Sequence, residues 1–303
     1  MKVPESRATF ALSPGSPDNA ISSAGATPPP VSKAGRNLPA AIGVASLLAA
    51  VVLVSLFANR PVFGIGVVGV AVGIGMWELI RALNADGVPV PMAPLLVGGP
   101  SMVAASYLRG ADGLSLALVL TVLAVMAWMI AEAGPDYLRG FTGATLVIVY
   151  VPLLASFAAL MAAPSDGARR VLVFVAATAC SDIGGYAFGS VFGRHAMAPS
   201  VSPKKSWEGF AGSAVTGLVF GAAALPLLFD DVAVWQGLVF GAVVVVAATV
   251  GDFGESLIKR DLGIKDMSDL LPGHGGVMDR LDSLLFAAPF AWVMLSAWAP
   301  VAR

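Results

Sequence analysis

Between residues 251 and 283 the chain reads GDFGESLIKRDLGIKDMSDLLPGHGGVMDRLDS, and long apolar runs lie on both sides of this stretch. It holds seven acidic residues, four basic residues and one of only two histidines, His274. Charges of both signs at this density beside apolar runs indicate a site for a metal ion and a polyanion. We therefore interpret the rest of the sequence as the support for this stretch.

The composition is typical of an integral membrane protein. The chain is 57% hydrophobic and 12% charged, with a mean hydropathy of +0.83, whereas soluble domains carry about a quarter charged residues. A helix of about 20 apolar residues spans the hydrocarbon of a bilayer. We predict an all-α polytopic integral membrane protein with about nine transmembrane helices and a polar active-site cavity that faces the cytoplasm. The predicted spans are residues 39–58, 62–80, 92–108, 114–132, 140–163, 171–192, 208–229, 232–250 and 281–299.

The distribution of basic residues predicts the orientation of the chain. With a cytoplasmic N-terminus, thirteen Lys and Arg residues fall on the inside and five on the outside, as the positive-inside rule requires. The 251–280 loop is then cytoplasmic, in a multi-pass protein of the cell membrane. The single cysteine, Cys180, lies inside an apolar segment, which excludes an intramolecular disulfide and a metal cluster built on thiolates.

The sequence predicts three regions. Residues 1–37 are rich in Pro, Ser, Gly and Ala without apolar periodicity, so we expect a disordered cytoplasmic tail. Residues 38–170 hold apolar spans with few polar side chains and are expected to be scaffold, whereas 171–303 are expected to form the catalytic region. Glu78 and Glu132 stand near ends of scaffold spans, and we interpret both as interfacial side chains that reach headgroups.

The sixth span carries Asp182 near its middle. An ionised carboxylate there costs at least ~2.5 kcal/mol, so an intramembrane acid is a functional candidate by default. The alternative is a hydrogen bond that serves helix packing alone. Gly185, Gly189 and Gly193 form a ridge at spacing four on the same helix, which predicts close approach of another helix and a buried polar pocket beside Asp182.

The polar segment 193–210 places Lys204 and Lys205 just before Trp207 and Glu208, where the seventh span begins. Two interpretations stay open. One is ordinary positive-inside anchoring with an interfacial Trp. The other is a phosphate-binding loop at the N-terminus of a helix.

Carboxylates recur at helical spacing around the loop. If the eighth helix continues as far as Lys259, then Asp252, Glu255 and Lys259 share one face. Asp279 and Asp282, three apart at the start of the ninth helix, also face one way. Together with Asp252 they suit a hard, oxygen-liganded cation such as Mg²⁺. A structural N-cap is the alternative for Asp279.

The loop 271–276, LPGHGG, is rich in turn residues. Its glycines permit positive backbone dihedrals and close approach of backbone N–H groups to phosphate oxygens. His274, between two glycines, is placed to contact phosphate. The sequence shows no Ser-His-Asp pattern. A phosphate monoester is itself an anionic nucleophile, so an enzyme that uses one needs positioning and charge neutralisation rather than a protein nucleophile.

These residues resemble the signature of the CDP-diacylglycerol synthases, or phosphatidate cytidylyltransferases. That signature runs Ser-x-apolar-Lys-Arg, then Lys-Asp after four residues, and ends in Pro-x-His-Gly-Gly-apolar-x-Asp-Arg-apolar-Asp. The block at 181–209 is also similar to the family, with Gly185 and Ser206 as mild departures. The signature positions are Ser256, Lys259, Arg260, Lys265, Asp266, Pro272, His274, Gly275, Gly276, Asp279, Arg280 and Asp282.

The resemblance implies transfer of a cytidylyl group from CTP to phosphatidic acid in phospholipid biosynthesis. It also implies Mg²⁺ held by Asp252, Asp279 and Asp282, a second, monovalent cation such as K⁺, and a homodimer among membrane lipids with no nucleic-acid partner. These aspartates form the predicted catalytic set with Lys259 and Arg260. The predicted substrate contacts are Asp182, Ser202, Lys204, Lys205, Glu208, Glu255, Lys265, Asp266, His274, Gly275, Gly276 and Arg280.

Three other classes of protein compete with this interpretation. A secondary transporter would use Asp182 as an ion relay at the midplane, but the charged loop argues against it because relay acids belong within helices. A non-enzymatic scaffold would leave the aspartates of the motif without a role. A lipid-alcohol kinase would also bind a nucleoside triphosphate, but its acceptor brings no phosphate. The many cations of this chain instead suit the meeting of two polyanions, which repel one another.

Overall fold

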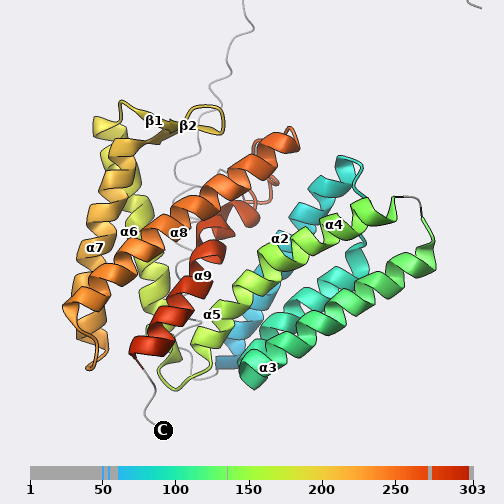
Figure 1. Cartoon of the computed structure of the whole chain (residues 1–303), viewed down its shortest axis with the longest axis horizontal. Helices are drawn as coiled ribbons and strands as arrows, with labels where there is room; N and C mark the ends of the chain where they lie inside the picture. Colours follow the sequence, from blue (N-terminus) through green and yellow to red (C-terminus); the bar gives the residue numbers. More distant parts are fainter. Residues whose placement is uncertain (1–49, 51–53, 55–60, 135, 272–274, 300–303) are drawn as a thin grey trace, which may run out of the picture. The chain divides into compact units, whose positions relative to one another are not determined.

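The computed structural model describes residues 50, 54, 61–134, 136–271 and 275–299. The predicted tail at 1–37, nearly all of the predicted span at 39–58, and His274 lie outside the described residues. In the described part, seven helices are long and apolar enough to cross a membrane. The chain is therefore a multi-pass membrane protein built from helices (Figure 1).

The helices follow the predicted order of spans. One span is continuous through α4, η1 and α5, where η1 is a π-helical turn around Pro152; proline lacks the N–H that a regular helix needs there. The elements are α2 (Pro61–Ala85), α3 (Met92–Glu132), α4 (Tyr137–Ile148), η1 (Val149–Leu153), α5 (Leu154–Ala162), α6 (Gly167–Phe192), α7 (Trp207–Leu228), α8 (Val234–Asp261) and α9 (Met278–Trp298).

The element α3 consists of two helical arms. Gly110, at the break between them, has φ 65° and ψ −148°, a non-helical conformation that glycine tolerates. The arms lie side by side, because a Cβ atom built on Gly98 would lie 2.4 Å from Thr121. They correspond to the predicted spans 92–108 and 114–132. The total of nine spans stays a prediction, since the first one is not described.

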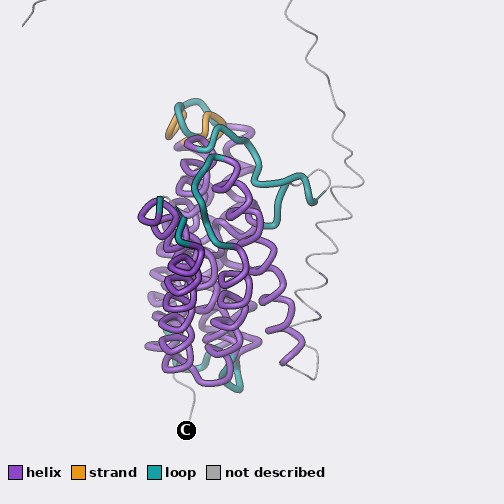
Figure 2. The backbone as a smooth tube through the Cα atoms, turned by 90° about the vertical axis from the view of Figure 1, so that its right-hand side faces the viewer, coloured by secondary structure: helices purple, strands orange, loops and turns teal. Residues whose placement is uncertain are grey.

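A short β-hairpin is the one departure from the predicted all-α fold among the described residues. It consists of β1 (Ala196–Ala198) and β2 (Ser202–Ser206), which pair antiparallel. Figure 2 shows the two strands at one end of the helices. Directly after β2, the Ser206 hydroxyl accepts a hydrogen bond of 3.1 Å from Gly209 N. This cap begins α7 at Trp207, which confirms the predicted start of the seventh span.

Close helix packing through glycine confirms the predicted ridge on α6. A Cβ atom on Gly189 would lie 3.4 Å from the Cα atom of Gly209 in α7. Farther along α7, a Cβ atom on Gly221 would lie 2.1 Å from the carbonyl oxygen of Gly237 in α8. Helices in lipid gain little from hydrophobic burial, so such backbone contact is what holds them together. As a result, α7 packs against α6 on one side and against α8 on the other.

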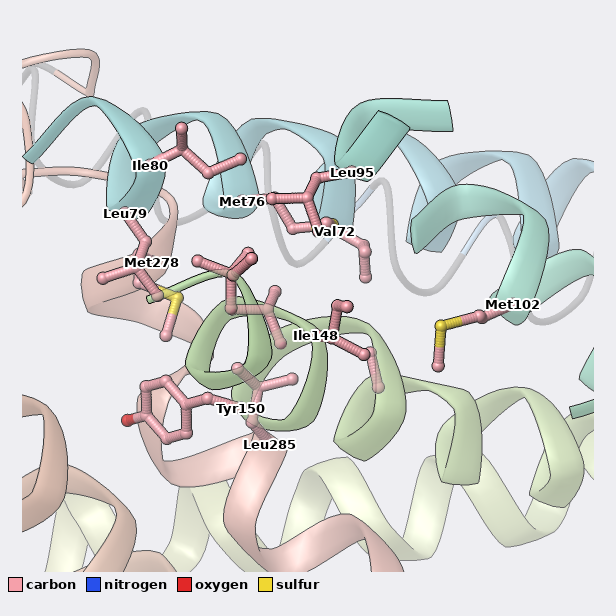
Figure 3. Close-up of a cluster of buried hydrophobic side chains, with 14 of the residues drawn as sticks. Val72, Met76, Leu79, Ile80, Leu95, Met102, Ile148, Tyr150, Met278 and Leu285 are labelled. Atoms are coloured by element: carbon pink, nitrogen blue, oxygen red, sulfur yellow. The ribbon is translucent and has the colours of Figure 1, made fainter. Parts of the chain in front are cut away.

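Buried apolar side chains form two clusters, and α9 belongs to both. The first joins α2, α3, α4 and α5 to the start of α9, where Met278 lies beside Leu79 of α2 (Figure 3). The second joins α6, α7 and α8 to the rest of α9, with Phe240 and Leu295 among its members. Figure 1 shows α9 between α5 and α8. The elements α2 to α9 form one compact unit, and the division into scaffold and catalytic regions stays a prediction.

Candidate active site

Helix α8 continues beyond its apolar part and ends at Asp261, so the condition under which the sequence placed three charged residues on one face is met. Asp252, Glu255 and Lys259 therefore share one face of a regular helix. Lys259 Nζ donates to Glu255 Oε2 at 3.1 Å and to Asp279 Oδ1 of α9 at 2.7 Å. A cation in the last turn is also favoured by the helix dipole. Lys259 thus joins α8 to α9 at the level of the motif.

Asp279 organises the loop that precedes α9. Its Oδ2 atom accepts hydrogen bonds from the backbone N–H groups of Met267 at 2.9 Å and Gly276 at 2.7 Å. Because Lys259 occupies Oδ1, both oxygens of this buried carboxylate are engaged. Asp279 lies inside the first turn of α9, which begins at Met278, so its interpretation as the N-cap residue is wrong. The Gly276 N–H, which we expected near phosphate, is donated to Asp279 instead.

The turn before α9 depends on one glycine conformation. Gly275 has φ 79°, which confirms the positive dihedral that the motif predicts. Its carbonyl oxygen accepts a hydrogen bond of 2.8 Å from Leu271 N. The chain reverses there, and Gly276 comes to lie beside the first turn of α9.

Glu78 of α2 is a member of the site that the sequence interpretation missed. It is 1% exposed and accepts hydrogen bonds from the N–H groups of Val277 at 3.0 Å and Met278 at 2.7 Å, and from the hydroxyl of Ser268. Its interpretation as an interfacial side chain is therefore wrong, whereas Glu132 is exposed. The one signal in the sequence was an acid within an apolar run. Its partners lie up to 200 residues away.

The β-hairpin brings Lys205 to helix α8. Lys205 Nζ contacts Asp252 Oδ2 and lies 4.5 Å from the ring centroid of Phe253. The cation is thus held by a carboxylate and by the face of an aromatic ring. The sequence left two roles open for this segment, membrane anchoring and phosphate binding. Lys205 lies beside an acid of the motif, which favours phosphate binding.

Glu208 and Arg260, two predicted site residues, hold the hairpin in place. Glu208 Oε2 accepts hydrogen bonds from the N–H groups of Arg194 at 3.1 Å and His195 at 3.2 Å, and Oε1 lies 2.5 Å from His195 Nδ1. Arg260 Nε donates to the carbonyl oxygen of Val201 at 3.2 Å. Neither side chain lines the cavity described next, so each contributes to the site through the position of the hairpin.

A cavity of about 470 Å³ lies between α6, α7, α8, the start of α9 and the β-hairpin. Its wall combines five carboxylates with four cationic side chains. Uncharged polar residues that the sequence did not single out, such as Tyr186 and Thr249, also line it. The predicted site residues that line the cavity are Asp182, Lys204, Lys205, Asp252, Lys259, Asp266, Asp279, Arg280 and Asp282.

The remaining predicted residues that are described lie outside the cavity wall. Ser202 begins β2, Lys265 is exposed in the loop after α8, and Gly275 and Gly276 form the turn before α9. Glu255 is fully buried, and its Oε1 atom has no hydrogen-bond partner. A buried carboxylate oxygen without a donor is unfavourable, and either a proton or an added cation would relieve it.

The carboxylates fit a hard cation by donor type. Asp252, Asp279 and Asp282 line the same cavity, and oxygen ligands are those that Mg²⁺ prefers. Among the described residues, however, no three His, Cys, Asp or Glu side chains are arranged to hold a metal ion. Asp252 is paired with Lys205, and Asp279 with Lys259. An ion would therefore have to displace these ammonium groups.

The chain belongs to the cytidylyltransferase family, whose model matches residues 39–298. It is 40% identical over 280 residues to the phosphatidate cytidylyltransferase of Mycobacterium leprae (strain TN), covering 87% of this chain and 89% of that protein. The identity to the phosphatidate cytidylyltransferase of Mycobacterium tuberculosis (strain ATCC 25618 / H37Rv) is 39% over 278 residues, covering 88% and 84% of the two chains. For the phosphatidate cytidylyltransferase of Pseudomonas aeruginosa it is 35% over 238 residues, covering 77% and 86%.

Proposed function

We propose that this chain is a phosphatidate cytidylyltransferase, which transfers the cytidylyl group of CTP to phosphatidic acid and yields CDP-diacylglycerol and pyrophosphate. The observation that carries the proposal is the cavity in which five carboxylates and four cations meet among membrane-spanning helices. Such a wall suits the encounter of two polyanions. Membership of the cytidylyltransferase family supports the nucleotide chemistry.

The reaction needs no nucleophile from the protein. A phosphate oxygen of phosphatidic acid forms a bond to the α-phosphorus of CTP, and the bond from that phosphorus to the oxygen that bridges it to the β-phosphorus breaks. Pyrophosphate leaves with the bridging oxygen. A phosphate monoester is largely a dianion at neutral pH, since its second pKa is about 6. The protein's task is therefore to align the two substrates and to neutralise their charge.

The cationic side chains of the cavity serve this task. Lys204 and Lys205 line it from the β-hairpin and Arg280 lines it from α9, so both elements bring positive charge to bound phosphates. Lys259 is engaged by Glu255 and Asp279, and it would release Asp279 when a cation binds there. We assign the loop around His274 to the leaving pyrophosphate. Asp182 of α6, within the membrane-spanning part, lines the route of the lipid headgroup.

We further propose Mg²⁺ as the cofactor, held by Asp252, Asp279 and Asp282, with a second, monovalent cation such as K⁺. When bound, Mg²⁺ would supply positive charge against the phosphate oxygens. An added cation is one way to satisfy the unpartnered oxygen of Glu255 beside these aspartates. A homodimer, residence in the cell membrane and a cytoplasmic cavity complete the proposal, on the strength of the family resemblance and the distribution of basic residues.

Purified protein in detergent, Mg²⁺, phosphatidic acid and CTP labelled at the α-phosphorus test this proposal. Label should enter the lipid fraction only when phosphatidic acid is present. CTP labelled at the γ-phosphorus should leave the lipid unlabelled. Transfer of γ-label, or use of diacylglycerol as the acceptor, would instead identify a lipid-alcohol kinase.

A further inference from the structure

We infer that Glu78, which α2 carries far from the catalytic motif, is a positioning residue for the cytidylyl transfer. It accepts hydrogen bonds from the first turn of α9 and thereby fixes the positions of Asp279, Arg280 and Asp282 at the cavity. Its effect on catalysis rests on the proposed function, whereas its effect on the loop rests on geometry alone. The experiments below separate the two.

The first turn of α9 is capped from another helix. The first N–H groups of a helix have no partner within it, and α9 has no capping side chain of its own. Val277 already has helical backbone angles, φ −67° and ψ −38°, so Gly276 stands at the capping position. The N–H groups of Val277 and Met278 donate to the two oxygens of Glu78. A carboxylate at this end of a helix is also favoured by the helix dipole.

The carboxylate of the cap is buried, which makes it costly to remove. Glu78 is 1% exposed and Met278 is 0% exposed. The Ser268 hydroxyl is a third donor to the carboxylate, so Glu78 also ties the middle of the loop to the start of α9. Without Glu78, the buried N–H groups would lose their acceptor and water could not easily replace it.

Gly276 has no side chain, and this leaves room for the carboxylate of Glu78. A Cβ atom on Gly276 would lie 2.7 Å from Oε1, 2.7 Å from Oε2 and 2.8 Å from Cδ of Glu78, and these are its three nearest atoms. The backbone at Gly276 does not have a positive φ, so the conformation itself admits a side chain. The contacts nearest to an added Cβ atom are therefore all with the carboxylate of Glu78.

The same turn leads directly into the catalytic set. Gly276 N donates to Asp279 Oδ2, and Asp279 Oδ1 accepts from Lys259. A displaced first turn of α9 would therefore move Asp279 relative to α8. Misplacement of a reacting group by about 1 Å can cost on the order of 100-fold in rate. The expected effect of losing Glu78 is thus on kcat more than on KM.

The first experiment compares Glu78→Ala with Glu132→Ala. Both remove an acid from a scaffold helix, but Glu132 is exposed and accepts its hydrogen bond from Trp128 of the same helix. Glu78→Ala should lower kcat by about 10- to 100-fold while KM for CTP changes much less, and Glu132→Ala should leave both unchanged. Glu78→Gln keeps the side-chain volume but presents amide N–H groups to N–H donors, so it should also lower kcat.

The second experiment moves the carboxylate to its neighbour. Gly276→Asp alone should inactivate the protein, because the new Cβ atom meets the carboxylate of Glu78. In the double variant Glu78→Ala/Gly276→Asp the space is free, and aspartate is a favoured capping residue. The double variant should recover at least about tenfold in kcat over Glu78→Ala, a non-additive result for residues in contact. A double variant no more active than Glu78→Ala would overturn the capping role.

The third experiment follows the loop without using activity. In a Cys180→Ala background, Asp269→Cys places a thiol in the exposed part of the loop. Glu78→Ala and Glu78→Gln should speed its modification by a maleimide severalfold, and Glu132→Ala should not. If the parent protein labels no lipid, the proposed function fails while this test of the loop still stands. The inference is overturned if both Glu78 variants keep kcat within about twofold of the parent, or lower it without changing the modification rate.

Discussion

Lys205 of the β-hairpin contacts Asp252 of helix α8 across the cavity, so the side chain predicted to bind phosphate is paired with one predicted to bind a cation. The two side chains are 26% and 33% exposed. Partly exposed ion pairs contribute only about 0–1 kcal/mol to stability. The pair can therefore exchange partners at little cost when a triphosphate and a cation enter the cavity.

This relationship predicts that Lys205→Met lowers activity without unfolding the protein. We expect kcat/KM for CTP to fall at least tenfold, because a phosphate-neutralising charge is lost, and the free energy of unfolding to change by less than about 1 kcal/mol. Steady-state kinetics and thermal unfolding check both values. Arg139→Met, which removes an exposed cation outside the cavity wall, is the control. Unchanged kinetics for Lys205→Met would contradict a role in phosphate binding.

The three aspartates of the predicted metal set should differ in their effect on stability. Asp252→Asn and Asp282→Asn should abolish turnover and leave the fold intact. Asp279→Asn should in addition cost about 1.5–3 kcal/mol, because its carboxylate accepts from Lys259 and from two backbone N–H groups. Activity across a Mg²⁺ titration, with thermal unfolding, distinguishes these effects. If an Asp→Asn variant keeps near wild-type activity at low Mg²⁺, the aspartate that it replaces is not a ligand of the ion.

Two glycines on one face of the motif helix offer a matched test of the α8–α9 contact. A Cβ atom on Gly251 would lie 2.6 Å from the Asp282 carbonyl oxygen and 2.7 Å from Phe286 Cβ, whereas Gly254 has nothing within 4 Å. Gly251→Ala should destabilise the protein by about 1–3 kcal/mol and lower activity, since it pushes Asp282 away from α8. Gly254→Ala should be neutral or stabilise by up to about 1 kcal/mol. Equal effects would show that close approach is not required.

The proposed orientation predicts that the β-hairpin and the motif loop face the same side of the membrane. The helices α7 and α8 lie between them, so the chain crosses twice and returns. Single cysteines from Ser200→Cys and Asp269→Cys, in a Cys180→Ala background, should both be modified in intact cells only by reagents that cross the membrane. Modification of either one by an impermeant reagent would overturn the cytoplasmic assignment.

Several features of the fold were predictable because their cause lies within one segment. Hydropathy located the described spans, and helical spacing extended α8 to Lys259. The glycines of α6 predicted close contact with another helix, which the structure shows to be α7 at Gly189. Helical spacing also indicated four of the charged residues that line the cavity, Asp252, Lys259, Asp279 and Asp282. Hydropathy did not predict the β-hairpin, because its three-residue and five-residue strands are too short to show an alternation of apolar and polar residues.

The motif by itself determined which residues bring charge to the site. The tertiary structure decided which of these charged groups pair with one another and with backbone N–H groups. The sequence identified Asp279 as an acid facing a cavity, but only the packing of α8 against α9 shows that both of its oxygens are engaged. Glu78 was classified with Glu132 because the two look alike in their own segments. Its partners lie about 200 residues away. Periodicity and hydropathy act along one helix, whereas the pairing of a buried carboxylate with its donors depends on which helices meet.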